Sequence, residues 1–190
     1  DAATAQQVAA VITEAGGKAT SAACDVTQEA DLVAAVDLAV NAFGGLTILV
    51  NNAGGGGPKP FDMPMSDMRF AFELNLFSVF RLCQLAAPHM AQAGGGAILN
   101  ITSMAGENKN QRMASYGASK AAENHLTRNI AFDLGPKSIR VNAIAPGATR
   151  TDALKKVLTP EIEAKMLEHT PLKRLGEPAD MANAALFLCS

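Results

Sequence analysis

Apolar residues recur along this chain in two patterns, one typical of helices and one of strands. Spacings of three and four residues, typical of amphipathic helices, predict long helices at 4–15, 28–43, 66–93 and 115–134. Continuous apolar runs, typical of strands buried on both faces of a parallel sheet, lie at 46–50, 97–101 and 139–145. A further strand is predicted at 18–26, and shorter helices at 151–158, 160–168 and 178–189.

Glycine and proline separate these segments. Helix stops are predicted at Gly16-Gly17, Gly44-Gly45, Gly94-Gly95-Gly96 and Gly135-Pro136. The repeated order helix, strand, helix, strand is the βαβ pattern, whose usual solution is a parallel sheet with helices on both faces. The sequence therefore predicts an α/β fold with a doubly wound parallel sheet, with residues 1–190 in a single domain.

Composition and charge narrow the classes of function. Hydrophobic residues make up 48% of the chain and charged residues 18%, which excludes intrinsic disorder. The formal net charge of −2 argues against binding to nucleic acid or to an anionic membrane. No apolar stretch approaches the ~20 residues that span a bilayer, and the N-terminal residues do not follow a signal-peptide pattern.

The cysteines indicate the compartment. The chain has three cysteines, Cys24, Cys83 and Cys189, which lie far apart in the sequence. They are accompanied by neither a CxxC motif nor a histidine-rich spacing. We therefore expect no metal site and a reducing, cytoplasmic environment.

Ligands of doubly wound sheets bind outside the carboxyl ends of the strands. In this chain the segments that follow the predicted strands are rich in glycine and small polar residues: Asp25-Val26, Asn51-Asn52-Ala53-Gly54, Thr102-Ser103-Met104 and Pro146-Gly147-Ala148-Thr149. We therefore expect the ligand-binding and catalytic residues in these four segments.

Tyr116 and Lys120 stand four residues apart on a predicted helix, so their side chains share one face. An ammonium beside a phenol favours the phenolate, the form that acts as a general base. Ser103 lies 116 − 103 = 13 residues earlier, at the end of a predicted strand, where its hydroxyl can face the phenol. The tyrosine and lysine alone are usually part of an ordinary amphipathic helix, but together with Ser103 and the two glycine-containing loops they form a specific pattern.

The chain resembles the classical short-chain dehydrogenases/reductases. The residues that carry the resemblance are Asn51-Asn52-Ala53-Gly54, Asn75, Ser103, Tyr116-Gly117-Ala118-Ser119-Lys120, Pro146-Gly147 and the segment Arg174 to Ala182. The resemblance implies a Rossmann-like sheet. The loop from Gly54 to Pro64 and the segment from Glu107 to Asn110 most resemble the bacterial 7α-hydroxysteroid dehydrogenases within this family.

The resemblance implies four catalytic residues. Tyr116 would exchange a proton with the reacting oxygen, while Ser103 hydrogen-bonds that oxygen. Lys120 would hold the nicotinamide ribose and favour the phenolate, and Asn75 would anchor a water that links Lys120 to solvent. The hydride would move to or from a cofactor, because no side chain can accept one.

The same resemblance implies the binding residues. Cofactor contacts are expected from Asp25, Val26, Asn52, Ala53, Gly54, Tyr116, Lys120, Pro146, Gly147, Thr149 and Thr151. Substrate contacts are expected from Gly56, Ser103, Asn108 and Tyr116. Two alternatives remain open: Asp25 as a solvated residue or cap at a strand end, and Asn51 as a structural bridge between strands.

The chain departs from the family pattern at both ends. No glycine-rich turn precedes Asp1, so we expect the first βαβ portion and the last strand of the family to lie outside these residues, the domain being partial at both ends. The residue that selects NAD or NADP would lie in the missing portion. NAD is expected from the narrower resemblance, and NADP is not excluded.

The resulting hypothesis is an oxidoreductase that interconverts a secondary alcohol and a ketone, with the 7α-hydroxyl of a bile acid as its substrate group. Met63, Met65, Met104 and Met113 would give the cleft adaptable apolar contacts. Reduction of a 3-oxoacyl chain on a carrier protein is an alternative within the class, and a non-catalytic binding module on the same fold is an alternative outside it.

The two longest predicted helices carry more apolar residues than one sheet-facing stripe requires, among them Phe70, Phe77, Phe80, Ala118, Leu126 and Phe132. A homo-oligomer is therefore expected, and the family resemblance implies a tetramer.

Overall fold

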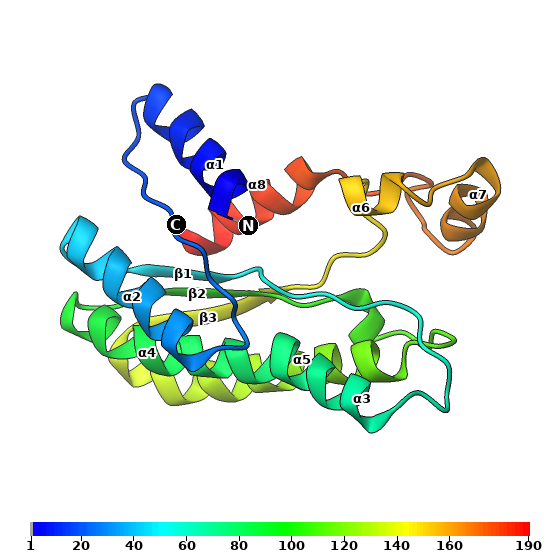
Figure 1. Cartoon of the computed structure of the whole chain (residues 1–190), viewed down its shortest axis with the longest axis horizontal. Helices are drawn as coiled ribbons and strands as arrows, with labels where there is room; N and C mark the ends of the chain where they lie inside the picture. The colour runs from blue at the N-terminus through cyan, green and yellow to red at the C-terminus, as the bar shows by residue number, and fades with distance from the viewer. Residues whose placement is uncertain (1) are drawn as a thin grey trace.

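The structure is a computed structural model that describes residues 2–190. Its helices and strands alternate along most of the chain, as Figure 1 shows. In order they are α1 (Ala2–Glu14), α2 (Glu29–Phe43), β1 (Ile48–Asn51), α3 (Met65–Phe72), the π-helical turn η1 (Glu73–Phe77), α4 (Ser78–Gln92), β2 (Gly96–Ile101), the 3-10 turn η2 (Met104–Gly106), α5 (Ala114–Leu134), η3 (Gly135–Lys137), β3 (Ile139–Ile144), α6 (Asp152–Lys155), α7 (Pro160–Glu168) and α8 (Pro178–Cys189).

The three strands form one parallel sheet in the order β1, β2, β3. Asn51 pairs with Asn100 across the first two strands, and Ile101 pairs with Ile144 across the second and third. Helices α3 and α4 connect β1 to β2, and α5 connects β2 to β3, so both connections are βαβ units. All three strands therefore end at the same edge of the sheet, and the loops that follow them converge there.

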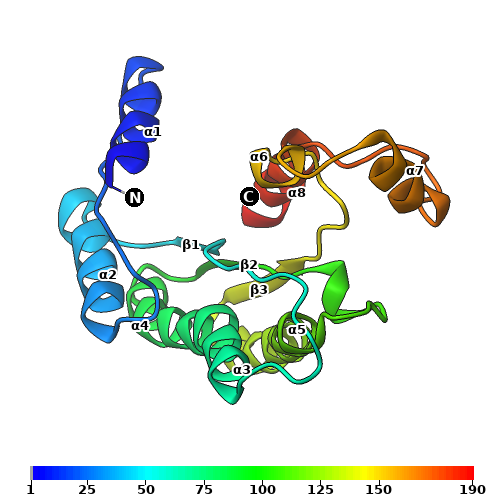
Figure 2. The ribbon, with the colours of Figure 1, turned by 45° about the vertical axis from the view of Figure 1, so that its right-hand side comes forward.

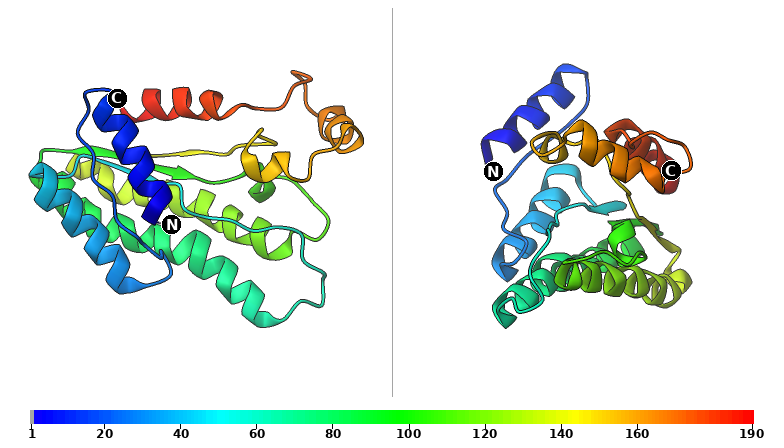
Figure 3. Two further views of the ribbon diagram at one scale, coloured as in Figure 1. Left: turned by 45° about the horizontal axis from the view of Figure 1, so that its top comes forward. Right: turned by 90° about the vertical axis from the view of Figure 1, so that its right-hand side faces the viewer.

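Helices lie on both sides of the sheet, which agrees with the predicted α/β class (Figures 1 and 2). Helices α4 and α5 cover one face, with α2 packed against α4. Helix α8 packs on β2 and β3 from the other side, and α1 lies on that side too (Figure 3). The main core fills the space between α4, α5 and the sheet, with Val79, Cys83, Ala86, Met90, Ile98, Ile130 and Ile139 among its buried residues.

The predicted strand at 18–26 is wrong, because the structure has no strand in that segment. A strand is held by hydrogen bonds to a neighbour, and among residues 2–190 no strand pairs with this one. The prediction that 46–50 and 139–145 are buried on both faces is also wrong, since Arg140 and Ala143 in β3 are exposed. Ile48 and Val50 are each 46% exposed, because α8 covers β2 and β3 on that face and β1 forms the edge.

The predicted helix at 66–93 is present but is interrupted by the wider turn η1. Residues Met65–Gln92 together form a helical stretch that is, by length and composition alone, long and apolar enough to cross a membrane. The prediction that no stretch of the chain could span a bilayer is therefore wrong by this criterion. The core helix of a soluble protein passes the same test, and α4 buries Val79, Cys83, Ala86 and Met90 inside this protein.

Candidate active site

A cavity of about 250 Å³ lies where the loops after β1, β2 and β3 converge. Its walls come from all three strand ends and from α5, as expected for a parallel sheet. The lining residues are Asn52, Gly54, Ile101, Thr102, Ser103, Tyr116, Lys120, Pro146, Gly147, Thr149 and Thr151. The structure thus brings together nine residues predicted to bind or catalyse from segments up to a hundred residues apart.

The N-terminal turns of α5 place Tyr116 and Lys120 at this cavity. The chain passes so close to Tyr116 at Gly56 that a Cβ atom there would stand 2.5 Å from the ring. A side chain at position 56 would displace the phenol, so glycine is required by this close approach. Gly56 therefore contacts Tyr116, although it does not line the cavity itself.

Ser103 ends the segment after β2 and begins the turn η2. Its Oγ accepts a hydrogen bond from the amide of Ala105 at 3.1 Å. This bond fixes the side chain while leaving the hydroxyl proton free to point into the cavity.

Lys120 is buried, with only 3% of its surface exposed. Its Nζ donates to the carbonyl of Ile101 at 2.8 Å and to Oε2 of Glu123 at 2.7 Å. Glu123 is fully buried, and burial raises the pKa of its carboxyl to about 7 even though Lys120 opposes the shift. The sequence analysis missed Glu123; its spacing of three residues from Lys120 on one helix was the available signal.

Asn75 is fully buried in the π-helical turn η1. Its amide exchanges two hydrogen bonds with the backbone of Gly55, both at 2.9 Å, and donates to Oγ of Ser119 at 3.1 Å. Ser119 in turn donates to the carbonyl of Tyr116 at 2.9 Å. Asn75 therefore ties the loop after β1 to the helix that carries Tyr116 and Lys120. π-Helical turns are often found at functional sites.

The loop after β3 forms the remaining wall. Thr149 Oγ1 donates to the carbonyl of Gly147, and Thr149 also forms an isolated bridge with Gly176. Thr151 caps α6 by accepting a hydrogen bond from the amide of Leu154. These local bonds hold the two threonines against the cavity.

Several predicted binding residues lie outside the cavity: Asp25, Val26, Ala53, Gly56, Asn75 and Asn108. Asp25 is exposed and accepts hydrogen bonds from the backbone amide and the hydroxyl of Thr27, which lower its pKa. This geometry matches the solvated, capping role considered as the alternative for Asp25, but at a turn instead of a strand end. Asn108 is an exposed residue whose amide bonds to the carbonyl of Met104.

A buried polar network runs from β1 into α5 behind the cavity. Asn51 donates to Oδ1 of Asn100 at 2.8 Å, and Asn100 donates to Oγ1 of Thr127 at 2.9 Å. The bridging role considered for Asn51 is therefore confirmed. Within residues 2–190 no group of three His, Cys, Asp or Glu side chains is placed to hold a metal ion.

Comparison with known proteins adds an independent finding. The sequence family described as enoyl-(acyl carrier protein) reductase matches residues 1–190. A 7α-hydroxysteroid dehydrogenase of Escherichia coli (strain K12) is 65% identical over 179 residues, covering 94% of this chain and 70% of the relative. A 3α-hydroxysteroid dehydrogenase of Mediterraneibacter gnavus is 43% identical over 163 residues, covering 85% and 64%.

A solved structure gives the same result for the fold. It is a 7α-hydroxysteroid dehydrogenase complexed with NADH and 7-oxo glycochenodeoxycholic acid, and its sequence is 63% identical to this chain. The two structures align with a TM-score of 0.96, and the alignment covers 100% of this chain and 74% of the solved one. On this evidence of sequence and fold, the chain belongs to the short-chain dehydrogenase/reductase family of oxidoreductases.

Proposed function

We propose that this protein uses NAD to interconvert a secondary alcohol and a ketone, and that its substrate group is the 7α-hydroxyl of a bile acid. The observation that carries the proposal is the single cavity that holds Ser103, Tyr116 and Lys120 at the carboxyl ends of the strands. The similarity to a relative named as a 7α-hydroxysteroid dehydrogenase supports the choice of substrate. In this proposal, residues 1–190 belong to a single domain.

Tyr116 is the proton-transfer group in this proposal. In the oxidation direction its phenolate takes the proton of the substrate hydroxyl, and in reduction its phenol returns that proton to the carbonyl oxygen. Ser103 donates a hydrogen bond from its hydroxyl to the carbonyl oxygen and stabilises the charge that develops on it. Both groups line the same cavity, and Ala105 already orients the serine.

The cavity has the donors and the open space that a nicotinamide ribose needs. Lys120 Nζ has three protons and uses two of them within the protein, which leaves one for a ribose hydroxyl. A Cβ atom at Gly54 would stand 3.2 Å from Nζ, so glycine keeps this approach clear. Bound NAD would accept or supply the hydride, which no side chain can do.

Asn75 has a positioning role in this proposal. Its three hydrogen bonds join Gly55 to Ser119, the residue that precedes Lys120 on α5. The predicted water between Asn75 and Lys120 would extend this chain of polar groups toward solvent. Gly56 and Asn108 remain proposed substrate contacts, as Asp25, Val26 and Ala53 remain proposed cofactor contacts.

The test is absorbance at the reduced-nicotinamide band with NAD or NADP and a 7α-hydroxy bile acid or its 7β epimer. We expect turnover of the 7α compound with NAD. Turnover of neither epimer would remove the steroid from the proposal, and reduction of a 3-oxoacyl substrate in the same assay would assign the alternative activity.

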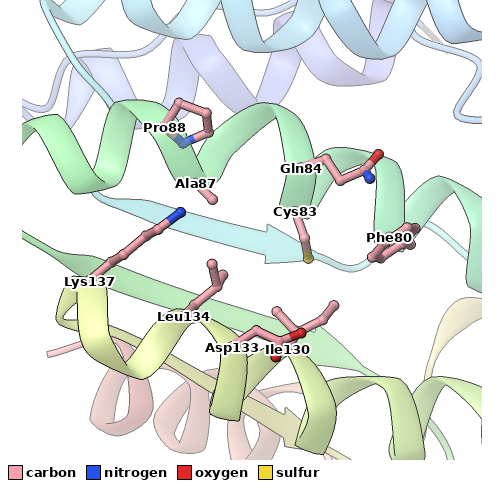
Figure 4. A pocket seen from close by; sticks show the side chains of 9 residues that line it. All are labelled: Phe80, Cys83, Gln84, Ala87, Pro88, Ile130, Asp133, Leu134 and Lys137. Carbon is pink, nitrogen blue, oxygen red and sulfur yellow. The ribbon is translucent and has the colours of Figure 1, made fainter.

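We also propose that the protein assembles as a homotetramer. The face of α4 and α5 turned away from the sheet exposes Phe80 (43%) and Phe132 (87%), and Phe70 and Phe77 are exposed nearby. Between the two helices lies an apolar hollow of about 250 Å³, lined by Phe80, Cys83, Gln84, Ala87, Pro88, Ile130, Asp133, Leu134 and Lys137 (Figure 4). A second copy is the proposed occupant, because the family resemblance implies a tetramer. Sedimentation as a monomer at micromolar concentration would contradict this.

We place the protein in the cytoplasm. Cys24, Cys83 and Cys189 are all free thiols in the structure, and free thiols persist in reducing compartments. Cell fractionation tests the assignment, and recovery with the membrane or secreted fraction would contradict it.

A further inference from the structure

Behind Lys120, away from the cavity, the structure buries a carboxylate that the proposed reaction does not use. Glu123 is 0% exposed, and its Oε2 accepts from Lys120 Nζ at 2.7 Å. Within residues 2–190 its other oxygen, Oε1, has no hydrogen-bond partner. Buried polar atoms are nearly always paired, and the partner of this carboxylate among residues 2–190 is the Lys120 ammonium.

The ionisable side chains that interact with Glu123 come from two helices. Lys120 belongs to its own helix, and Cys83 reaches it from α4. Burial raises the pKa of the Cys83 thiol to about 12, with a smaller contribution in the same direction from Glu123. The thiol therefore stays neutral near neutral pH, and the charge of Glu123 acts mainly on the Lys120 ammonium.

We propose that Glu123 is a positioning residue for Lys120, which fixes the ammonium at the cavity wall and offsets part of the charge that the ammonium presents to Tyr116. The ammonium favours the phenolate, whereas the carboxylate behind it disfavours it. Both charges are buried or close to the cavity, where solvent screens them weakly. The inference rests on the proposed function only in assigning Tyr116 and Lys120 to the reaction.

The composition of the chain offers a direct test. Tyr116 is the only tyrosine among the 190 residues, and there is no tryptophan. The phenolate absorption of this one side chain is therefore read as the difference between the unmodified protein and the Tyr116→Phe protein, without substrate or cofactor.

The variant to titrate is Glu123→Gln, because glutamine keeps the volume and can still accept from Lys120 Nζ while removing the charge. We expect its phenolate band to appear at a pH about one unit lower than in the unmodified protein. The acidic limb of the kcat/KM profile for alcohol oxidation should move in the same direction.

Asp133→Asn is the matched control. Asp133 is exposed on the same helix, 133 − 120 = 13 residues beyond Lys120, or about 20 Å along the axis at 1.5 Å per residue. The Asp133→Asn substitution removes one negative charge from a position too far from the Lys120 amine to affect it. A Glu123→Gln titration that coincides with that of the unmodified protein, or that moves no further than that of Asp133→Asn, overturns the inference.

If Glu123→Gln does not fold, because Lys120 is left buried without a counter-charge, Glu123→Asp provides a second variant. This variant keeps the charge but shortens the side chain by one methylene. We expect its phenolate titration to lie between those of the unmodified protein and of Glu123→Gln, and its KM for NAD to be raised. A titration and KM equal to those of the unmodified protein would overturn the inference. If no steroid is turned over but the titrations differ as expected, the proposed substrate fails and this inference stands.

Discussion

Helices α4 and α5 pack on the same face of the sheet, but they bury different kinds of side chain. The buried face of α4 is mainly apolar, and its residues are Ser78, Val79, Cys83, Ala86, Ala87 and Met90. The buried face of α5 is mainly polar, and its residues are Ser115, Ser119, Lys120, Glu123, Thr127 and Ile130. Burial itself therefore does not distinguish the two helices; what differs is whether the buried atoms need partners.

The difference indicates a division of roles. Apolar burial on α4 stabilises the fold without directional requirements, whereas each polar group on α5 must find a hydrogen bond or lower the stability. The bonds of Ser119, Lys120 and Thr127 lead to neighbouring elements or to the helix backbone. The structure thus accepts a costly buried face on the helix that lines the cavity, and α4 contributes the apolar burial that offsets this cost.

The largest expected effect on α5 comes from Tyr116→Phe. Removing the hydroxyl removes the proposed proton transfer, and general acid–base catalysis typically contributes about 10²–10⁴-fold, so we expect kcat to fall by that factor. Tyr116 is only partly buried, and the midpoint of thermal unfolding should change little. The measurement is steady-state turnover at saturating cofactor, and a kcat within a few-fold of the unmodified value would remove Tyr116 from the reaction.

The converse change on α4 is Met90→Ala. Met90 is 0% exposed within the core, and truncating such a side chain costs about 2–5 kcal/mol of unfolding free energy. We expect urea denaturation to show this loss, while kcat per folded molecule remains unchanged. A fall in kcat per folded molecule at a temperature where the variant is fully folded would show that α4 also tunes the site, and the division between the helices would fail.

Much of this arrangement could be predicted from the sequence, because local periodicity and glycine stops define long helices well. Helix α5 was expected at 115–134 and is found at Ala114–Leu134. The convergence of Ser103 and Pro146 on one cavity followed from the rule that parallel strands end at one edge. The absence of a strand at 18–26 could not be predicted in the same way, because a strand depends on a neighbouring strand that its own sequence does not specify.

The buried polar face of α5 escaped sequence analysis for a related reason. A glutamate on an amphipathic helix is usually solvated, and the only local signal for Glu123 was its spacing of three residues from Lys120. Only the packing of α5 on the sheet shows that positions 120, 123 and 127 face inward. Asp25 shows the limit of the strand prediction, because it was expected at the end of a strand and instead accepts hydrogen bonds from Thr27 in a turn.

The buried Glu123 on α5 is expected to make the stability of the protein depend on pH. The pKa of Glu123 is raised from an ordinary 4.5 to about 7 in the folded protein, so the folded state binds this proton more tightly than the unfolded state does. Its contribution is fully present below pH 4.5 and is lost as the pH rises through 7, an expected fall of roughly 3 kcal/mol in unfolding free energy.

Urea denaturation at pH 5 and pH 8 measures this change. Glu123→Gln should lack the fall, and Asp133→Asn on the same helix should retain it. Equal pH dependence in the unmodified protein and in Glu123→Gln would mean that burial does not hold a proton on this carboxyl.

The smallest expected effects separate the two ends of the polar face of α5. Ser119→Ala removes one partner of Asn75 and the bond to the Tyr116 carbonyl, while Thr127→Val removes the partner of Asn100 farther from the cavity. Leaving a buried donor unpaired costs about 1–3 kcal/mol, so both variants should lose a similar amount of unfolding free energy. Only Ser119→Ala should also lower kcat, by a few-fold, because it alone loosens the helix turn that carries Tyr116. Since both substitutions remove one buried hydroxyl from the same helix, equal losses of kcat in the two variants would show that general stability, and not the position of Tyr116, sets the rate.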